Sequence, residues 1–119
     1  MADYTPIRKP GADLPILTSA AVTGGQLVYV SGNQTVAPTT AATGAWLGVA
    51  AFDAASGSKV TVHAGGVHEL AASGAIAAGA NVVGAAAGAV ATVGAGTIDT
   101  VVGVALGAAA NGKVVVKLR

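Results

Sequence analysis

The stretch Leu47-Gly-Val-Ala-Ala-Phe-Asp-Ala-Ala-Ser-Gly-Ser-Lys-Val-Thr-Val-His63 decides the fold, because the chain contains it twice. With one gap, it recurs as Val102-Gly-Val-Ala-Leu-Gly-Ala-Ala-Ala-Asn-Gly-Lys-Val-Val-Val-Lys117. The matching residues are a glycine near the start, a glycine in the turn and a lysine after the turn: Gly48 and Gly103, Gly57 and Gly112, Lys59 and Lys113. The repeat predicts that two parts of the chain fold in the same way.

Each copy has the pattern of a β-hairpin. Inward-facing apolar residues recur at every second position, at Val60, Val62 and Ala64 in the first copy and at Val114, Val116 and Leu118 in the second. A period of two is typical of a strand with one buried face. Asn111-Gly112 is a strong signal for a tight turn, because both residues tolerate a positive φ. His63 aligns with Lys117, so we expect its side chain on the outward face of its strand.

The repeat extends upstream of the hairpin. Ala21-Val-Thr-Gly-Gly-Gln-Leu-Val28 resembles Ala75-Ile-Ala-Ala-Gly-Ala-Asn-Val82, which gives a period of about 54 residues. Solenoid proteins need about three repeats for stability, so two copies better suit one domain formed by duplication. We therefore expect a single β domain over residues 18–119, with repeat one at about 18–70 and repeat two at about 71–119.

Short strands and frequent glycines predict an all-β fold. Leu27-Val-Tyr-Val30 is a compact apolar strand that Ser31-Gly32-Asn33 closes. The 18 glycines disfavour long helices, and we interpret Ala71–Ala80 as a loop followed by a strand. Many short strands separated by turn signals suggest a small β-sandwich or barrel with an internal two-fold sequence duplication. The pattern leaves the choice between sandwich and barrel open.

The first seventeen residues have no second copy in the sequence. Residues 1–17 include Pro6, Pro10 and Pro15, and proline fixes φ and lacks the donor that a central strand needs. This composition predicts an extended N-terminal arm or an edge strand. As an arm, the segment would lie on a neighbouring subunit; as an edge strand, it would belong to the domain itself.

Composition excludes several classes of function. Six basic and five acidic residues leave no basic stripe that could displace counterions from nucleic acid. Because cysteine is absent, the chain has neither a disulfide scaffold nor a thiolate metal site. Val82–Ile98 is uncharged, but its many Ala and Gly residues make it less apolar than a membrane-spanning helix requires. We expect no nucleic-acid partner and no membrane partner.

We find no set of residues arranged for catalysis. His63, His68 and Glu69 are close in sequence and could ligate zinc, but the alignment with Lys117 places His63 on an exposed strand face. The carboxylates are spread along the chain without a close pair for acid–base work. The glycine-rich stretches lack the lysine of a phosphate-binding loop. We predict no enzyme activity, no catalytic or metal-binding residues and no cofactor.

Three residues are candidates for packing or for contact with a partner. We expect Phe52 in the core, because aromatic residues are scarce in this chain. Trp46 could anchor the same core or act as an interface hot spot, since aromatic residues dominate such sites. His68 could lie partly buried at an interface, where its charge would respond to pH.

The segments Tyr4–Gly11, Ala20–Val28, Gly48–Gly57 with Val60–Val62, Ala71–Gly79 and Gly103–Leu106 form an ordered set of motifs. This set resembles the small capsid cement, or head decoration, proteins of tailed bacteriophages, and the resemblance covers nearly the whole chain. It implies a β-rich fold, trimers on the outer surface of the capsid and an N-terminal arm that contacts the shell. The family brings no catalytic residues to carry over.

The resemblance leads us to predict a capsid decoration protein that stabilises a phage head. Its partners would be the major capsid protein and further copies of itself, as a homotrimer on the outer capsid surface of the virion after synthesis in the host cytoplasm. Self-association would also bury surface that a core of small side chains cannot cover. The expected contact residues are Tyr4, Pro6, Ile7, Arg8, Lys9 and Pro10 of the capsid-binding arm, with Trp46 and His68 as possible interface residues.

Two other functions remain open at this stage. A surface adhesion or carbohydrate-binding module would present aromatic platforms to sugars, for which the chain offers only Trp46, Tyr4 and Tyr29. A structural protein of the phage tail is the second alternative, and the sequence hardly separates it from a head protein.

Overall fold

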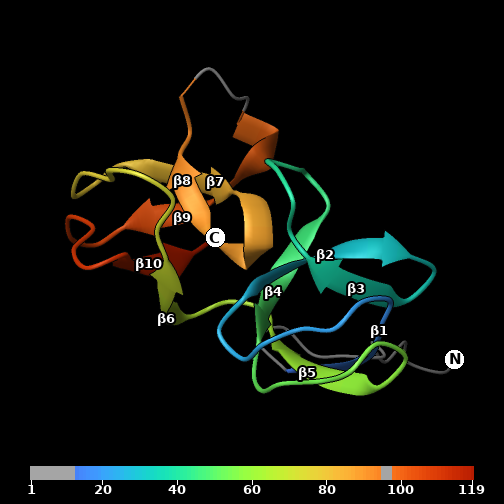
Figure 1. The fold of residues 1–119 in the computed structure, drawn as a ribbon. Coiled ribbons are helices and arrows are strands. Elements are labelled where there is room, and N and C mark those ends of the chain that lie inside the picture. Colours follow the sequence, from blue (N-terminus) through green and yellow to red (C-terminus); the bar gives the residue numbers. More distant parts are fainter. Residues whose placement is uncertain (1–12, 95–97) are drawn as a thin grey trace, which may run out of the picture.

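The computed structural model describes residues 13–94 and 98–119, and these form two five-stranded sheets (Figure 1). The strands of the first sheet are β1 (Leu14–Thr18), β2 (Leu27–Gly32), β3 (Thr35–Pro38), β4 (Trp46–Ala50) and β5 (Lys59–His63). Those of the second sheet are β6 (Val67–Ala71), β7 (Asn81–Gly84), β8 (Val90–Thr92), β9 (Val101–Ala105) and β10 (Lys113–Leu118). Two short 3₁₀ turns complete the described elements: η1 (Ala86–Gly88) and η2 (Ile98–Thr100). The expected all-β fold is confirmed.

The first sheet is a closed barrel with the strand order β1-β3-β2-β4-β5. It closes because β1 pairs with β5 in the antiparallel sense and with β3 in the parallel sense. The second sheet has the order β6-β10-β9-β7-β8, and a parallel bridge from Ala72 to Val90 connects its two outer strands. Closure leaves few unpaired strand edges, which is the usual way that small β proteins avoid pairing with other chains.

The backbone of the second sheet repeats that of the first about 54 residues later along the chain. The ladder between β2 and β4 has a bulge after Val28, and the ladder between β7 and β9 has one after Val82. The bond from Gly25 N to Ala50 O measures 2.8 Å, as does that from Gly79 N to Ala105 O. Positions related by this offset are called equivalent below. Duplication of one ancestral sequence stays a prediction.

The paired glycines of the repeat lie where two strands approach most closely. A Cβ at Gly48 would lie 2.2 Å from His63 O, and a Cβ at Gly103 would lie 2.1 Å from Lys117 O. Only glycine fits such a contact with a neighbouring backbone. The same two pairings place His63 and Lys117 at equivalent register positions, opposite Val49 and Val104.

The core consists mainly of valine and leucine. Both predicted alternations are confirmed within the strands, because β5 and β10 bury every second side chain. The prediction fails at Ala64, which is exposed because β5 has already ended at His63. One buried cluster belongs to the barrel alone, and a second contains Leu27 and Val49 from the barrel together with most of the buried residues of the second sheet. The two sheets therefore share part of their core and form one packed unit.

A tight junction joins the two sheets. The Thr39 hydroxyl, which is fully buried, donates to Ala85 O at 2.8 Å, and Gly88 N donates to Thr39 O at 3.0 Å. Gln26 Nε2 donates to Ala87 O at 3.0 Å. A Cβ at Gly88 would lie 2.6 Å from the Gln26 Cβ, so glycine permits this approach as well. The loop between β7 and β8 thus packs directly on the first sheet.

The last part of the N-terminal segment is a strand, which was one of its two predicted forms. Leu14–Thr18 is β1 of the barrel, while residues 1–12 lie outside the described residues, so the domain bounds stay a prediction. Pro15 is tolerated in β1 because β3 pairs only with Leu17 and Thr18, leaving the start of β1 with β5 as its sole neighbour. The second sheet already begins with β6 at Val67, because β6 pairs with β10.

Two further expectations have different outcomes. Ala71–Ala80 contains no helix and leads into β7, as predicted. The placement of Phe52 in the core is wrong, since its side chain is 49% exposed. β4 ends at Ala50 and the chain bends at Phe52, which directs this residue away from the valines of the barrel. Among the described residues, no helix is long and apolar enough to cross a membrane.

Candidate interaction site

A depression of about 380 Å³ lies where the chain passes from the first sheet to the second. Its wall consists of Asp13 and the six consecutive residues His63–His68. This wall combines a carboxylate and two imidazoles with glycine backbone and the apolar side chains of Ala64 and Val67. Its geometry is set by the end of β5, the start of β6 and the residue that precedes β1.

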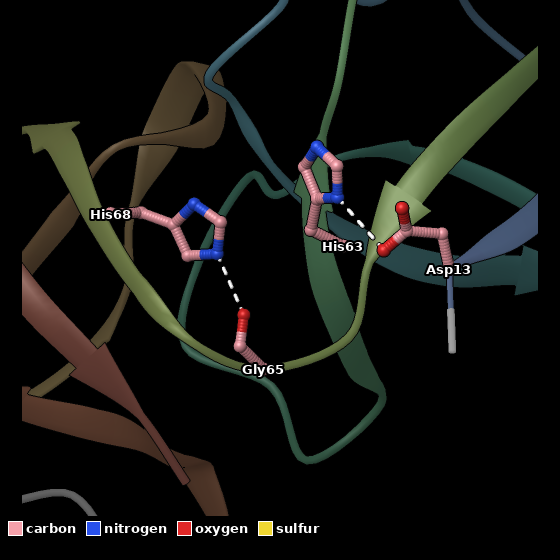
Figure 2. Close-up of polar contacts among 4 residues, drawn as sticks. All are labelled: Asp13, His63, Gly65 and His68. Carbon is pink, nitrogen blue, oxygen red and sulfur yellow. Dashed lines mark hydrogen bonds and ion pairs between the residues drawn. The ribbon is translucent and has the colours of Figure 1, made fainter. Parts of the chain in front are cut away.

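Asp13 and His63 form the main polar contact of the depression. His63 Nδ1 donates to Asp13 Oδ1 at 2.9 Å (Figure 2). β5 and β1 are antiparallel neighbours, so the end of β5 lies beside the start of β1 and the two side chains meet. The contact fixes the point at which the N-terminal segment joins the barrel.

His68 completes the depression from the other side. Its Nε2 donates to Gly65 O at 2.7 Å, and its ring stacks on that of His63 with a centroid distance of 5.8 Å and an angle of 22° (Figure 2). Gly65 has a φ of 137° and Gly66 a φ of 88°, values that favour glycine, and this turn brings the two histidines together. The linker between the sheets therefore has a defined shape.

The trio of His63, His68 and Glu69, which is close in sequence, is not brought together in the structure. Glu69 follows His68 on a strand, so its side chain points to the opposite face of β6. Within residues 13–94 and 98–119, no group of three His, Cys, Asp or Glu side chains is placed to hold a metal ion. The side chains and backbone that line the depression offer hydrogen-bond donors and acceptors.

The remaining predicted site residues are placed as follows. Tyr4, Pro6, Ile7, Arg8, Lys9 and Pro10 lie outside the described residues. Trp46 is half-buried and packs against the core cluster that the two sheets share, so at least part of its ring serves the fold. His68 is half-buried inside the depression. Asp13 was not singled out from the sequence, because its partner His63 lies fifty residues away and no local pattern connects them.

Comparison with known families decides the identity. The model of one family, described as phage cement protein, matches residues 8–119. The chain belongs to the phage cement protein family. The resemblance found from the ordered sequence motifs is thereby confirmed, and this cement protein is a capsid-associated structural protein.

A solved structure supports the fold of this cement protein. The crystal structure of the head fiber gp8.5 N base in bacteriophage phi29 matches with a TM-score of 0.68 at 19% sequence identity. The match covers 91% of this chain and 93% of that one, so the likeness extends to both sheets. A comparison with curated proteins finds no match.

Proposed function

We propose that this cement protein binds the outer surface of a phage head as a homotrimer and stabilises the shell through contacts with the major capsid protein. The observation that carries the proposal is the family match over residues 8–119. A shell offers many identical sites, so weak contacts repeated over its surface add up to a large stabilisation. The protein reaches this surface after its synthesis in the host cytoplasm.

The N-terminal segment is the proposed contact with the shell. Residues 1–12 carry Tyr4, Ile7, Arg8 and Lys9, which offer both apolar and charged groups to a partner. The contact between Asp13 and His63 supports this role, because it ties the root of the segment to the barrel. Because the segment is attached to the barrel at Asp13, its binding to the shell would keep the folded domain at the shell surface.

A purely structural role accounts for the chemistry of the described residues. We propose no catalytic activity, cofactor, nucleic-acid partner or membrane partner. A carbohydrate-binding role is not favoured, because such modules need exposed aromatic platforms and Trp46 packs on the core. No observation favours a position in the tail over one on the head.

Binding to purified heads tests the proposal. Phage heads that lack this protein are mixed with it and sedimented, and the bound fraction and the thermal stability of the heads are measured. We expect saturable binding and a higher melting temperature of the shell. Deletion of residues 1–12 should reduce the bound fraction, while the matched variant Ala108→Gln, on an exposed loop, should bind normally. Absence of binding by the full chain, or binding to isolated tails alone, would contradict the proposal.

A further inference from the structure

The junction between the two sheets is built from two different surfaces. One is the loop Ala85–Gly88 of the second sheet, called the donor loop because it is the segment that packs onto the other sheet; the name does not refer to the direction of its hydrogen bonds. The other is formed by Gln26, Leu27 and Thr39 of the first sheet, called the acceptor surface. A contact between unlike surfaces can in principle be repeated, because each partner keeps its other surface free.

Each sheet carries both surfaces at equivalent positions. The equivalent of the donor loop is Ser31–Gln34, which comprises the end of β2 and the turn into β3, as the donor loop lies between β7 and β8. The equivalents of Gln26, Leu27 and Thr39 are Ala80, Asn81 and Val93. This assignment rests on matched bonds: Thr39 N donates to Leu27 O at 3.0 Å and Val93 N to Asn81 O at 3.0 Å, while Gln26 N donates to Thr23 O at 3.1 Å and Ala80 N to Ala77 O at 3.1 Å.

The two remaining surfaces are less covered than those of the junction. Leu27 and Thr39 are fully buried, whereas Asn81 is exposed and Val93 is half-buried. Ala80 is half-buried too, because one side of it packs against the core cluster that the two sheets share. Ser31–Gln34 is exposed throughout. Figure 1 shows the β2–β3 hairpin, in cyan, extending away from the second sheet. One loop and one acceptor surface are therefore left without a partner within the described part of the chain.

Side-chain sizes are exchanged between the used and the unused surfaces. In the junction, Gly88 faces the larger Gln26, and a Cβ at Gly84 would lie 3.3 Å from Leu27 Cδ2. At the equivalent unused positions the order is reversed, with Gln34 on the loop and Ala80 on the acceptor side. Val30 occupies the position equivalent to Gly84 and is likewise the larger residue. At Gln34 and Ala80 the loop residue is thus the larger one and the acceptor residue the smaller one, the reverse of the order in the junction.

We propose that the hairpin around Ser31–Gln34 of one copy packs on Ala80, Asn81 and Val93 of a second copy, head to tail. The occupant of the acceptor surface is thus a second copy of this chain, in continuity with the junction inside each copy. The proposal rests on the self-association in the proposed function and names its surface. Such a contact closes into a ring, as a cyclic homotrimer requires, or continues as a filament.

Sedimentation velocity of the isolated full chain, over a wide range of concentrations, tests the interface without phage heads. We expect concentration-dependent self-association. Ala80→Gln places a large residue opposite Gln34 and should weaken association by about tenfold or more, and Gln34→Gly should weaken it by leaving a void. The double variant restores the size order seen between Gln26 and Gly88 and should recover association. Circular dichroism checks that each variant is folded.

Ala108→Gln is the matched control, because it adds the same side chain on an exposed loop and should leave association unchanged. A monomer at every concentration would overturn the proposal, and so would a double variant that associates no better than Ala80→Gln. Head binding is measured separately, so binding by a monomeric chain would leave the decoration function standing while the assigned interface fails.

Discussion

The imidazole of His63, at the end of β5, donates to the carboxylate of Asp13, the residue before β1, at 2.9 Å. Both side chains are partly exposed, with 39% of His63 and 53% of Asp13 accessible. An exposed pair of this kind contributes little free energy. It adds a side-chain contact beside the backbone pairing of Leu14 with Val62, which already places the start of β1 on β5.

His63→Ala tests that view. We expect the free energy of unfolding to fall by less than about 1 kcal/mol, because solvent screens the pair. Urea unfolding followed by circular dichroism measures this change. Head binding should weaken more than stability does, since the root of the proposed arm is released. Ala108→Gln, on an exposed loop, leaves the contact between His63 and Asp13 intact and is the control. Equal binding by the two variants would argue against this role.

Gly48→Ala and Gly103→Ala should each be strongly destabilising. The added Cβ would lie 2.2 Å from His63 O in the first case and 2.1 Å from Lys117 O in the second, so two strands must separate. We expect losses of about 3 kcal/mol in urea unfolding. Gly107→Ala is the matched control, because nothing lies within 4 Å of its Cβ position. A mild effect at Gly48 would show that the strands can move apart easily.

Thr39→Val should weaken the junction between the two sheets. The substitution conserves shape but removes the hydroxyl that donates to Ala85 O at 2.8 Å. Because Thr39 is fully buried, the carbonyl loses a partner that water does not readily replace, and we expect a loss of about 1–3 kcal/mol. Thr40→Val, at an exposed position, should change stability by less than about 0.5 kcal/mol. Thermal unfolding of both variants gives the comparison.

Leu70→Ala should test the shared core. Leu70 is fully buried in the cluster that contains residues of both sheets, so truncation should cost about 2–5 kcal/mol. Leu106→Ala removes the same atoms from a side chain that is 54% exposed and should cost about 0.5 kcal/mol or less. A single transition by calorimetry is expected for both variants. Two separate transitions would mean that the sheets unfold independently.

Much of the fold could be read from local patterns. The alternation at Val60 and Val62 predicted β5, and Asn111-Gly112 predicted a turn in which both residues have positive φ. These features depend on neighbours in sequence, and the period of a strand is fixed by its own backbone. The family was likewise recognised from the order of motifs along the chain.

Phe52 and the choice between arm and edge strand could not be read in this way. Aromatic character suggested a core position for Phe52, but the bend after β4 decides where its side chain points. Prolines left an arm and an edge strand open through residue 17, and pairing with β5 makes Leu14–Thr18 a barrel strand. Both outcomes depend on partners far away in sequence, and local composition carries no information about them.

The sequence by itself determined the strands of the repeated hairpin, their turns and the family, because each is encoded in residue types at short or regular spacing. Only the tertiary structure brought Asp13 to His63, stacked His63 on His68 and packed the loop at Ala85 on Thr39. It also showed that Gly88 packs on Gln26 while its equivalent Gln34 is exposed. The physical reason is that these contacts arise when closed sheets bring distant segments together, and packing between sheets is decided by three-dimensional fit.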